Sequence, residues 1–173
     1  IVYEFDATDM ASGFMFPAMA REFRRGGIQF AAIFSYDMLR TAPMNLGWQT
    51  HFFNMVFTPS KAVSSMIAAE VMRRIPRGKH FGYYPDNRTF DDFRVSYDEQ
   101  LSELNSGDMF YYSNTTSTRP KNLAALKHIA GVGSSPVVRY SGTGIYFLDK
   151  QDDNTWQLEI YPDIMAVSYT HLT

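Results

Sequence analysis

The feature that most constrains the fold is an apolar run at residues 28–37, which follows a helix-like segment. The run is nearly continuous in apolar side chains, as is typical of a strand with both faces covered. Residues 14–25 are predicted to form the preceding helix, because Pro17 suits a first turn and Gly26 and Gly27 suit a helix end. Another β-prone run opens the chain. This strand, helix and strand in succession predict a parallel pair.

Alternation of side chains separates the two faces of each predicted strand. In the first strand, Glu4 and Asp6 share a face with Val2, opposite Tyr3 and Phe5. In the second strand the larger side chains face helices, while the smaller and more polar face suits the interior of a barrel. That second face comprises Gln29, Ala31, Ile33, Ser35 and Asp37. Both strands therefore end in carboxylates.

A second helix is predicted from Pro59 to about residue 75. Thr58 suits the N-cap, and Pro59 suits the first helical position because its missing N–H would be unpaired there. Apolar side chains then recur at helical spacing, at Val63, Met66, Ile67 and Val71.

From about Arg77 the pattern changes to short β-prone runs separated by turn residues. The runs are residues 81–84, 93–97, 101–104, 109–112, 136–140, 144–148 and 156–160. Their spacing of roughly 8–12 residues favours an antiparallel β-sandwich. We therefore expect an α/β unit at residues 1–77 and an all-β unit at 78–166. Residues 167–173 follow no earlier pattern and are interpreted as a non-native tail.

Composition and charge exclude several classes of function. The net charge is −2, with 16 Lys and Arg against 18 Asp and Glu and no basic block, so no nucleic-acid partner is expected. No apolar run approaches the roughly 20 residues of a membrane span. There are no cysteines, and the four histidines are scattered, so neither a metal site nor a cofactor is expected. Any export signal would lie upstream of Ile1.

Six short strings along the chain carry a resemblance to one enzyme group. They are YEFD (residues 3–6), FSYD (34–37), WQTH (48–51), FTPSKA (57–62), YYSNTT (111–116) and GVGSSP (131–136). Their order resembles Bacteroidetes polysaccharide-degrading glycosyl hydrolases related to the cellulase and β-galactosidase clan. The resemblance covers nearly all of residues 1–165.

The resemblance implies both a fold and an activity. The expected fold is the last β-α-β-α portion of a (β/α)8 TIM barrel, followed by the antiparallel β-sandwich as an accessory domain. Glu4 matches the nucleophile position at the end of the seventh barrel strand, and residues 28–37 match the eighth strand. The acid/base glutamate and the rest of the barrel would lie upstream of Ile1, so this chain alone is expected to be inactive. The enzyme would be secreted or periplasmic.

Retaining glycosidases use two carboxylates about 5–5.5 Å apart, one as nucleophile and one as acid/base. Glu4 would supply the first role. Asp6 would hold a sugar hydroxyl or tune Glu4 by like-charge repulsion. Alternatively, both side chains simply pair with Arg or Lys at the strand end.

Five further side chains are candidates for binding substrate. Tyr36 and Asp37 end the second strand and would bind a substrate hydroxyl, although Asp37 equally suits a turn or cap acceptor. In the following loop, Trp48 would stack on a sugar ring, and Gln49 and His51 would bond hydroxyls. The alternative for this loop is ordinary packing.

The predicted function is hydrolysis of a β-linked polysaccharide or oligosaccharide by a two-carboxylate, retaining mechanism. A second interpretation is a non-catalytic carbohydrate-binding or structural β-sandwich module with a barrel remnant. A third is a degenerate relative that has lost hydrolysis.

Overall fold

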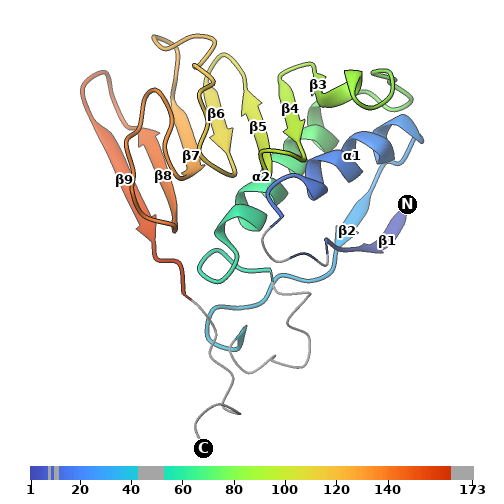
Figure 1. Cartoon of the computed structure of the whole chain (residues 1–173), viewed down its shortest axis with the longest axis horizontal. Helices are drawn as coiled ribbons and strands as arrows, with labels where there is room; N and C mark the ends of the chain where they lie inside the picture. The colour runs from blue at the N-terminus through green and yellow to red at the C-terminus, as the bar shows by residue number, and fades with distance from the viewer. Residues whose placement is uncertain (8, 10–11, 43–52, 165–173) are drawn as a thin grey trace, which may run out of the picture.

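The computed structural model describes residues 1–7, 9, 12–42 and 53–164 of the 173-residue chain. It contains two α-helices, a two-stranded sheet and a seven-stranded sheet within these residues. Figure 1 shows the helices between the two sheets, with the larger sheet on one side and the small sheet on the other.

The predicted parallel pair is confirmed. Strand β1 (Val2–Phe5) pairs in parallel with β2 (Ala31–Ile33), and helix α1 (Met15–Arg25) connects them. Strand β2 is much shorter than the apolar run that predicted it. Its neighbour β1 ends at Phe5, and the bond from Phe34 N to Phe5 O, 2.9 Å long, is the last between the two segments.

Strict alternation along the first strand is wrong, because the pairing contains a bulge. Val2 lies opposite Ala31 and Phe5 opposite Ile33, so three steps on β1 match two on β2. Tyr3, expected to lie on the same face as Phe5, is 81% exposed. Phe5 itself packs edge-on against Phe16 and Phe23 of α1.

Helix α1 begins and ends close to the predicted residues. At its start, the hydroxyl oxygen of Ser12 accepts a hydrogen bond from Met15 N at 3.2 Å. At its end, Gly27 has a φ of +77°, a conformation that glycine adopts without strain, and Ile28 N bonds back to Phe23 O at 2.9 Å.

Helix α2 (Pro59–Arg74) also confirms the prediction from helical spacing. Thr58 is its N-cap residue, but the predicted side-chain cap is wrong. The Thr58 hydroxyl instead bonds to Asn54, accepting from Asn54 N and donating to Asn54 O, at 3.0 Å each. At the other end, Arg24 Nε donates to Ile75 O at 2.6 Å, so the two helices are tied together where both finish.

The seven strands of the larger sheet follow chain order. They are β3 (Thr89–Phe90), preceded by the 3-10 helix η3 (Asp86–Arg88), β4 (Phe93–Ser96), β5 (Leu101–Asn105), β6 (Met109–Tyr112), β7 (His128–Val132), β8 (Ile145–Lys150) and β9 (Trp156–Tyr161). All neighbours are antiparallel except β6 and β7, which are parallel. Helix α2 contacts β5 to β8 and covers one face of the sheet (Figure 1).

The predicted fold class is therefore wrong in both halves. The β-rich half is one mixed sheet covered by a helix, and not two antiparallel sheets packed on each other. The expected TIM-barrel portion is a two-stranded parallel sheet whose helices pack on that mixed sheet. Alternation marks which strand face is buried, but it does not distinguish a covering helix from a covering sheet.

One hydrophobic core joins these layers. It includes Phe16 of α1, Val63 and Ile67 of α2, and Phe93 and Leu104 of the large sheet, all almost fully buried. Residues on both sides of the expected boundary at 77 thus contribute to a common core. The division into residues 1–77 and 78–166 stays a prediction.

Candidate functional site

Acidic side chains meet a buried lysine where β1 ends. Lys61, in the first turn of α2, places Nζ 3.1 Å from Oδ1 of Asp6. The Lys61 side chain is 0% exposed and that of Asp6 is 10% exposed. An ion pair that is this well buried is removed from water, so each partner depends on the other for compensation of its charge.

Burial disfavours the charged form of Lys61, and the nearby carboxylates favour that charged form. Burial lowers the pKa of Lys61 below its usual 10.5, while the hydrogen bond and charge of Asp6 oppose this effect. The charges of Asp9 and Asp37 act in the same direction as Asp6. The Phe16 ring centre lies 5.6 Å from the ammonium.

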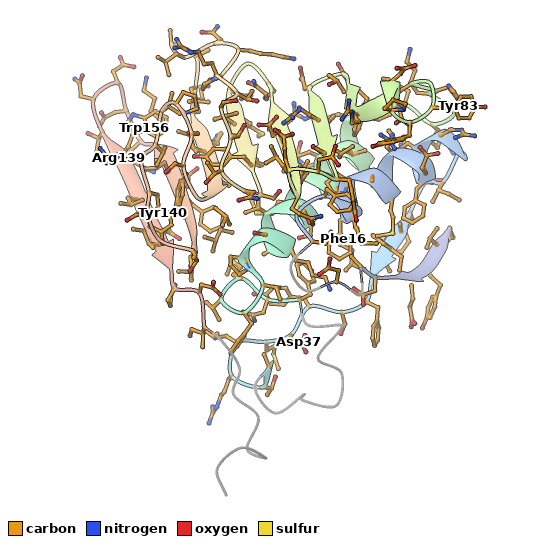
Figure 2. The ribbon with its side chains drawn as sticks, in the orientation of Figure 1. Phe16, Asp37, Tyr83, Arg139, Tyr140 and Trp156 are labelled. Carbon is orange, nitrogen blue, oxygen red and sulfur yellow. The ribbon has the colours of Figure 1, made fainter. Side chains whose placement is uncertain are left out.

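Asp37 follows β2 and anchors the chain segment that leads into α2. Its carboxylate accepts a hydrogen bond from Phe53 N at 3.2 Å, and its own N–H donates to Phe53 O at 2.8 Å. Asn54 donates its side-chain N–H to the Asp37 carbonyl at 2.5 Å. Figure 2 labels Asp37 on this segment, beyond the end of β2. The Asp37 carboxylate therefore joins the segment after β2 to a residue 16 positions further along the chain, and its predicted role in binding substrate stays a prediction.

Glu4 is on the exposed part of β1. Within the residues that the structure describes, its carboxylate makes no hydrogen bond and no ion pair. The predicted alternative of pairing with a basic residue at the strand end thus describes Asp6, which pairs with Lys61, and does not describe Glu4.

Tyr36 lies beside this group of residues. It is 49% exposed, and its ring packs edge-on against Phe53 with ring centres 5.3 Å apart. One side of the ring is thus held by the segment that Asp37 anchors, and the other side faces solvent. Trp48, Gln49 and His51, predicted to bind substrate, lie outside the described residues and stay predictions.

Two other buried carboxylates are fully engaged elsewhere. Glu70 on α2 bonds to Arg73 at 2.6 Å and to Arg74 at 2.8 Å. Glu103 on β5 accepts bonds from Arg94, Thr116 and Thr118. These carboxylates stabilise the sheet and its helix and leave little capacity for a substrate.

Lys61 is the residue that reasoning from the sequence missed. It stands three residues after the Thr58 cap, directly before Ala62 and Val63, which are both buried. A lysine on the buried side of a helix requires an acidic partner, and this requirement was the available signal. The identity of that partner, 55 residues away in Asp6, depends on the tertiary fold.

The described residues contain neither a cluster of metal ligands nor a membrane-spanning helix. There is no group of three or more His, Cys, Asp or Glu side chains there that could hold a metal ion. No helix in the same residues is long and apolar enough to cross a membrane.

Comparison with protein-family models, with curated proteins and with solved structures found no match to this chain. Its function must therefore be argued from the geometry above.

Proposed function

We propose that this chain supplies part of the active site of a glycoside hydrolase, with Glu4 as the nucleophile. The observation that carries the proposal is the exposed Glu4 carboxylate, which has no partner within the described residues, beside an Asp6 that is held by Lys61. The substrate would be a β-linked polysaccharide or oligosaccharide. The protein would be secreted or periplasmic.

The proposed reaction follows the retaining mechanism. The Glu4 carboxylate attacks the anomeric carbon, and the bond to the leaving oxygen breaks as a second carboxylic acid protonates that oxygen. Water, deprotonated by the same second group, then releases the sugar from Glu4. The second carboxylic acid would come from a part of the enzyme outside residues 1–173, so the chain alone would be inactive.

The neighbouring residues would support Glu4 in two ways. Lys61 compensates the negative charge of Asp6, which limits repulsion between Asp6 and the Glu4 carboxylate. The half-exposed ring of Tyr36, together with Trp48, Gln49 and His51, would contact the sugar. Asp37 would keep Tyr36 in place through its bonds to Phe53 and Asn54.

The test is turnover of aryl β-glycosides by the full-length protein that contains this chain. Glu4→Gln keeps the size of the side chain but removes the nucleophile, so turnover should fall to near the uncatalysed rate. The matched control is Glu159→Gln, an exposed glutamate on β9, which should leave turnover unchanged. Unchanged turnover in Glu4→Gln would remove Glu4 from the mechanism.

The second candidate function is a non-catalytic carbohydrate-binding or structural module. It is favoured by the commitment of Asp6 to Lys61 and of Asp37 to Phe53, which leaves Glu4 as the one unengaged acid of the three. Affinity electrophoresis of the whole chain in plant polysaccharides separates the alternatives. Retardation without any hydrolysis by the full-length protein supports a binding module, and neither retardation nor hydrolysis supports a structural one.

A further inference from the structure

A cleft of about 440 Å³ opens where the start of α2 meets the ends of β6 and β7. Gly142 and Thr143, in the turn before β8, and Asp163, after β9, form its remaining walls. The volume is within the range of about 300–1,000 Å³ that is typical of small-ligand sites. Glu4, Asp6 and Lys61 do not line the cleft, so it is distinct from the group of acids around Lys61.

Close backbone approaches shape two of the walls. Gly133 has a φ of +75°, and a Cβ there would lie 2.3 Å from the Thr115 hydroxyl oxygen. That oxygen accepts a hydrogen bond from Ser134 N at 3.1 Å, which joins the ends of β6 and β7. Any larger residue at 133 would push this wall outward.

The third wall is positioned by a second glycine. A Cβ on Gly144 would lie 2.0 Å from Tyr161 O, so only glycine lets the segment after β9 run so close to the start of β8. The same segment is tied to the turn before α2 by a bond from Ile164 N to Val56 O at 2.6 Å. Asp163 lies between these two attachments, and its backbone is therefore held at the cleft.

Three polar side chains line the cleft with hydrogen-bonding capacity to spare. The carboxylate of Asp163 and the hydroxyls of Ser60 and Thr143 make no hydrogen bond and no ion pair within the part of the chain that the structure describes. They come from three different segments of the chain. A ligand between them would find acceptors at Asp163 and donor–acceptor hydroxyls at Ser60 and Thr143.

Charge selects the class of ligand. The N-terminal end of α2 carries partial positive charge, which disfavours a cation, and the Asp163 carboxylate disfavours an anion. A neutral molecule with several hydroxyls satisfies both, because each hydroxyl can donate to Asp163 and accept from Ser60 or Thr143. The partly exposed Phe57 lines the cleft and supplies apolar surface for the C–H face of such a molecule.

We propose that this cleft binds a neutral saccharide of about disaccharide size. The site would be a binding site apart from Glu4, so it holds for either candidate function. If no saccharide binds in this cleft, the proposed hydrolysis at Glu4 is unaffected. If Glu4 is not the nucleophile, the proposed saccharide site is unaffected.

The test is an NMR titration of the whole ¹⁵N-labelled chain with the neutral disaccharides cellobiose, laminaribiose and maltose. Inorganic phosphate serves as the anionic probe. At least one disaccharide should cause saturable shifts at the amides of Thr143 and Asp163. Asp163→Ala should weaken its binding about tenfold, because a hydrogen bond to a charged acceptor is lost. Thr143→Val, which keeps the shape of the side chain, should weaken it about fivefold.

The matched control is Asp153→Ala, an exposed aspartate in the β8–β9 turn that does not line the cleft, which should leave binding unchanged. Both Asp163 and Thr143 are exposed, so the variants should fold, and the spectrum of each variant checks this directly. No saturable shift with any of the disaccharides would overturn the proposal. So would saturable shifts with phosphate alone, or shifts with a disaccharide that persist unchanged in Asp163→Ala and Thr143→Val.

Discussion

Lys61 Nζ lies 3.1 Å from Asp6 Oδ1, and this ion pair joins the first turn of α2 to the chain just after β1. Because the Lys61 side chain is inaccessible to solvent, this is a buried ion pair and not a surface ion pair. It connects the strand that bears Glu4 to the helix that covers the large sheet. The position of the candidate nucleophile therefore depends on a contact made in the protein interior.

Removing one partner of this pair should be costly. Lys61→Met keeps most of the side-chain volume but leaves Asp6 without its counter-charge, so we expect the free energy of unfolding to fall by about 3–5 kcal/mol. The matched control is Lys121→Met, because Lys121 pairs with Asp92 on the surface, and it should cost about 0–1 kcal/mol. Urea unfolding measures the free energy of unfolding of both variants. Equal decreases in the two variants would contradict a buried ion pair at Lys61.

The pH dependence of stability should carry the signature of Lys61. Since burial lowers its pKa in the folded protein, the unfolded chain binds more protons at this residue over the range between the lowered pKa and 10.5. The contribution of Lys61 to stability therefore rises as pH increases toward 10.5. The difference in unfolding free energy between wild type and Lys61→Met should grow in the same direction, and a difference that shrinks would contradict the lowered pKa.

Gly131 on β7 should not tolerate a side chain. It pairs with Tyr112 on one side and Tyr146 on the other, and a Cβ would lie 2.5 Å from the Tyr112 ring and 2.7 Å from the Tyr146 hydroxyl. Gly131→Ala should cost about 1–3 kcal/mol through overpacking. Gly107→Ala is the control, because its Cβ would meet nothing within 4 Å. Thermal unfolding of the two variants compares them, and similar stability would refute this packing.

The hydroxyls of Tyr112 and Tyr146 bond to each other, and Tyr146 also donates to Gly133 O at 2.9 Å. Burial raises the pKa of both phenols above the usual 10.0; for Tyr146 the hydrogen bond shared with Tyr112 raises it further. Stability from these groups is thus present below pH 10 and is lost as pH rises past it. Ultraviolet titration of the folded protein should show Tyr112 and Tyr146 ionising above the ordinary range of a tyrosine. If all the tyrosines of the folded protein ionised in one transition of the absorbance with pH, the raised pKa of Tyr112 and Tyr146 would be contradicted.

Local pattern was sufficient to predict both helices and five strands of the large sheet. The alternating runs at residues 93–97, 101–104, 109–112, 144–148 and 156–160 became β4, β5, β6, β8 and β9. These segments carry aromatic and branched side chains that suit a half-buried pleated surface. The parallel pair of β1 and β2 followed from the succession of strand, helix and strand in the sequence.

Two predicted strands are absent from the described residues, and two observed strands, β3 and β7, were not predicted. Residues 136–140 are not a strand, because Ser134 and Ser135 bond to backbone groups of Val138 and Tyr140 and hold a turn. Residues 81–84 likewise form no strand. Strand β7 was missed because its alanine and glycine have low strand propensity, although Gly131 is required there by the rings on either side.

The candidate site was foreseen only in part. A strand that ends in carboxylates is visible in the sequence, and it drew attention to Glu4, Asp6 and Asp37. The commitment of Asp6 to Lys61 and of Asp37 to Phe53 depends on contacts between distant segments, which no local pattern encodes. The cleft near Asp163 is likewise formed by five separate segments of the chain, and none of its residues has a distinctive sequence signal by itself.

The most direct test of the central claim is covalent trapping of the full-length protein. It would be incubated with an activated 2-deoxy-2-fluoro-β-glycoside of the sugar whose aryl glycoside is cleaved fastest, because the fluorine slows release of the glycosyl-enzyme. Mass spectrometry of the digested protein then locates the bound sugar. We predict that it is attached to the peptide that contains Glu4 and that it is absent in Glu4→Gln. A sugar attached to another carboxylate, or no covalent sugar in an enzyme that turns over the aryl glycoside, would contradict Glu4 as the nucleophile.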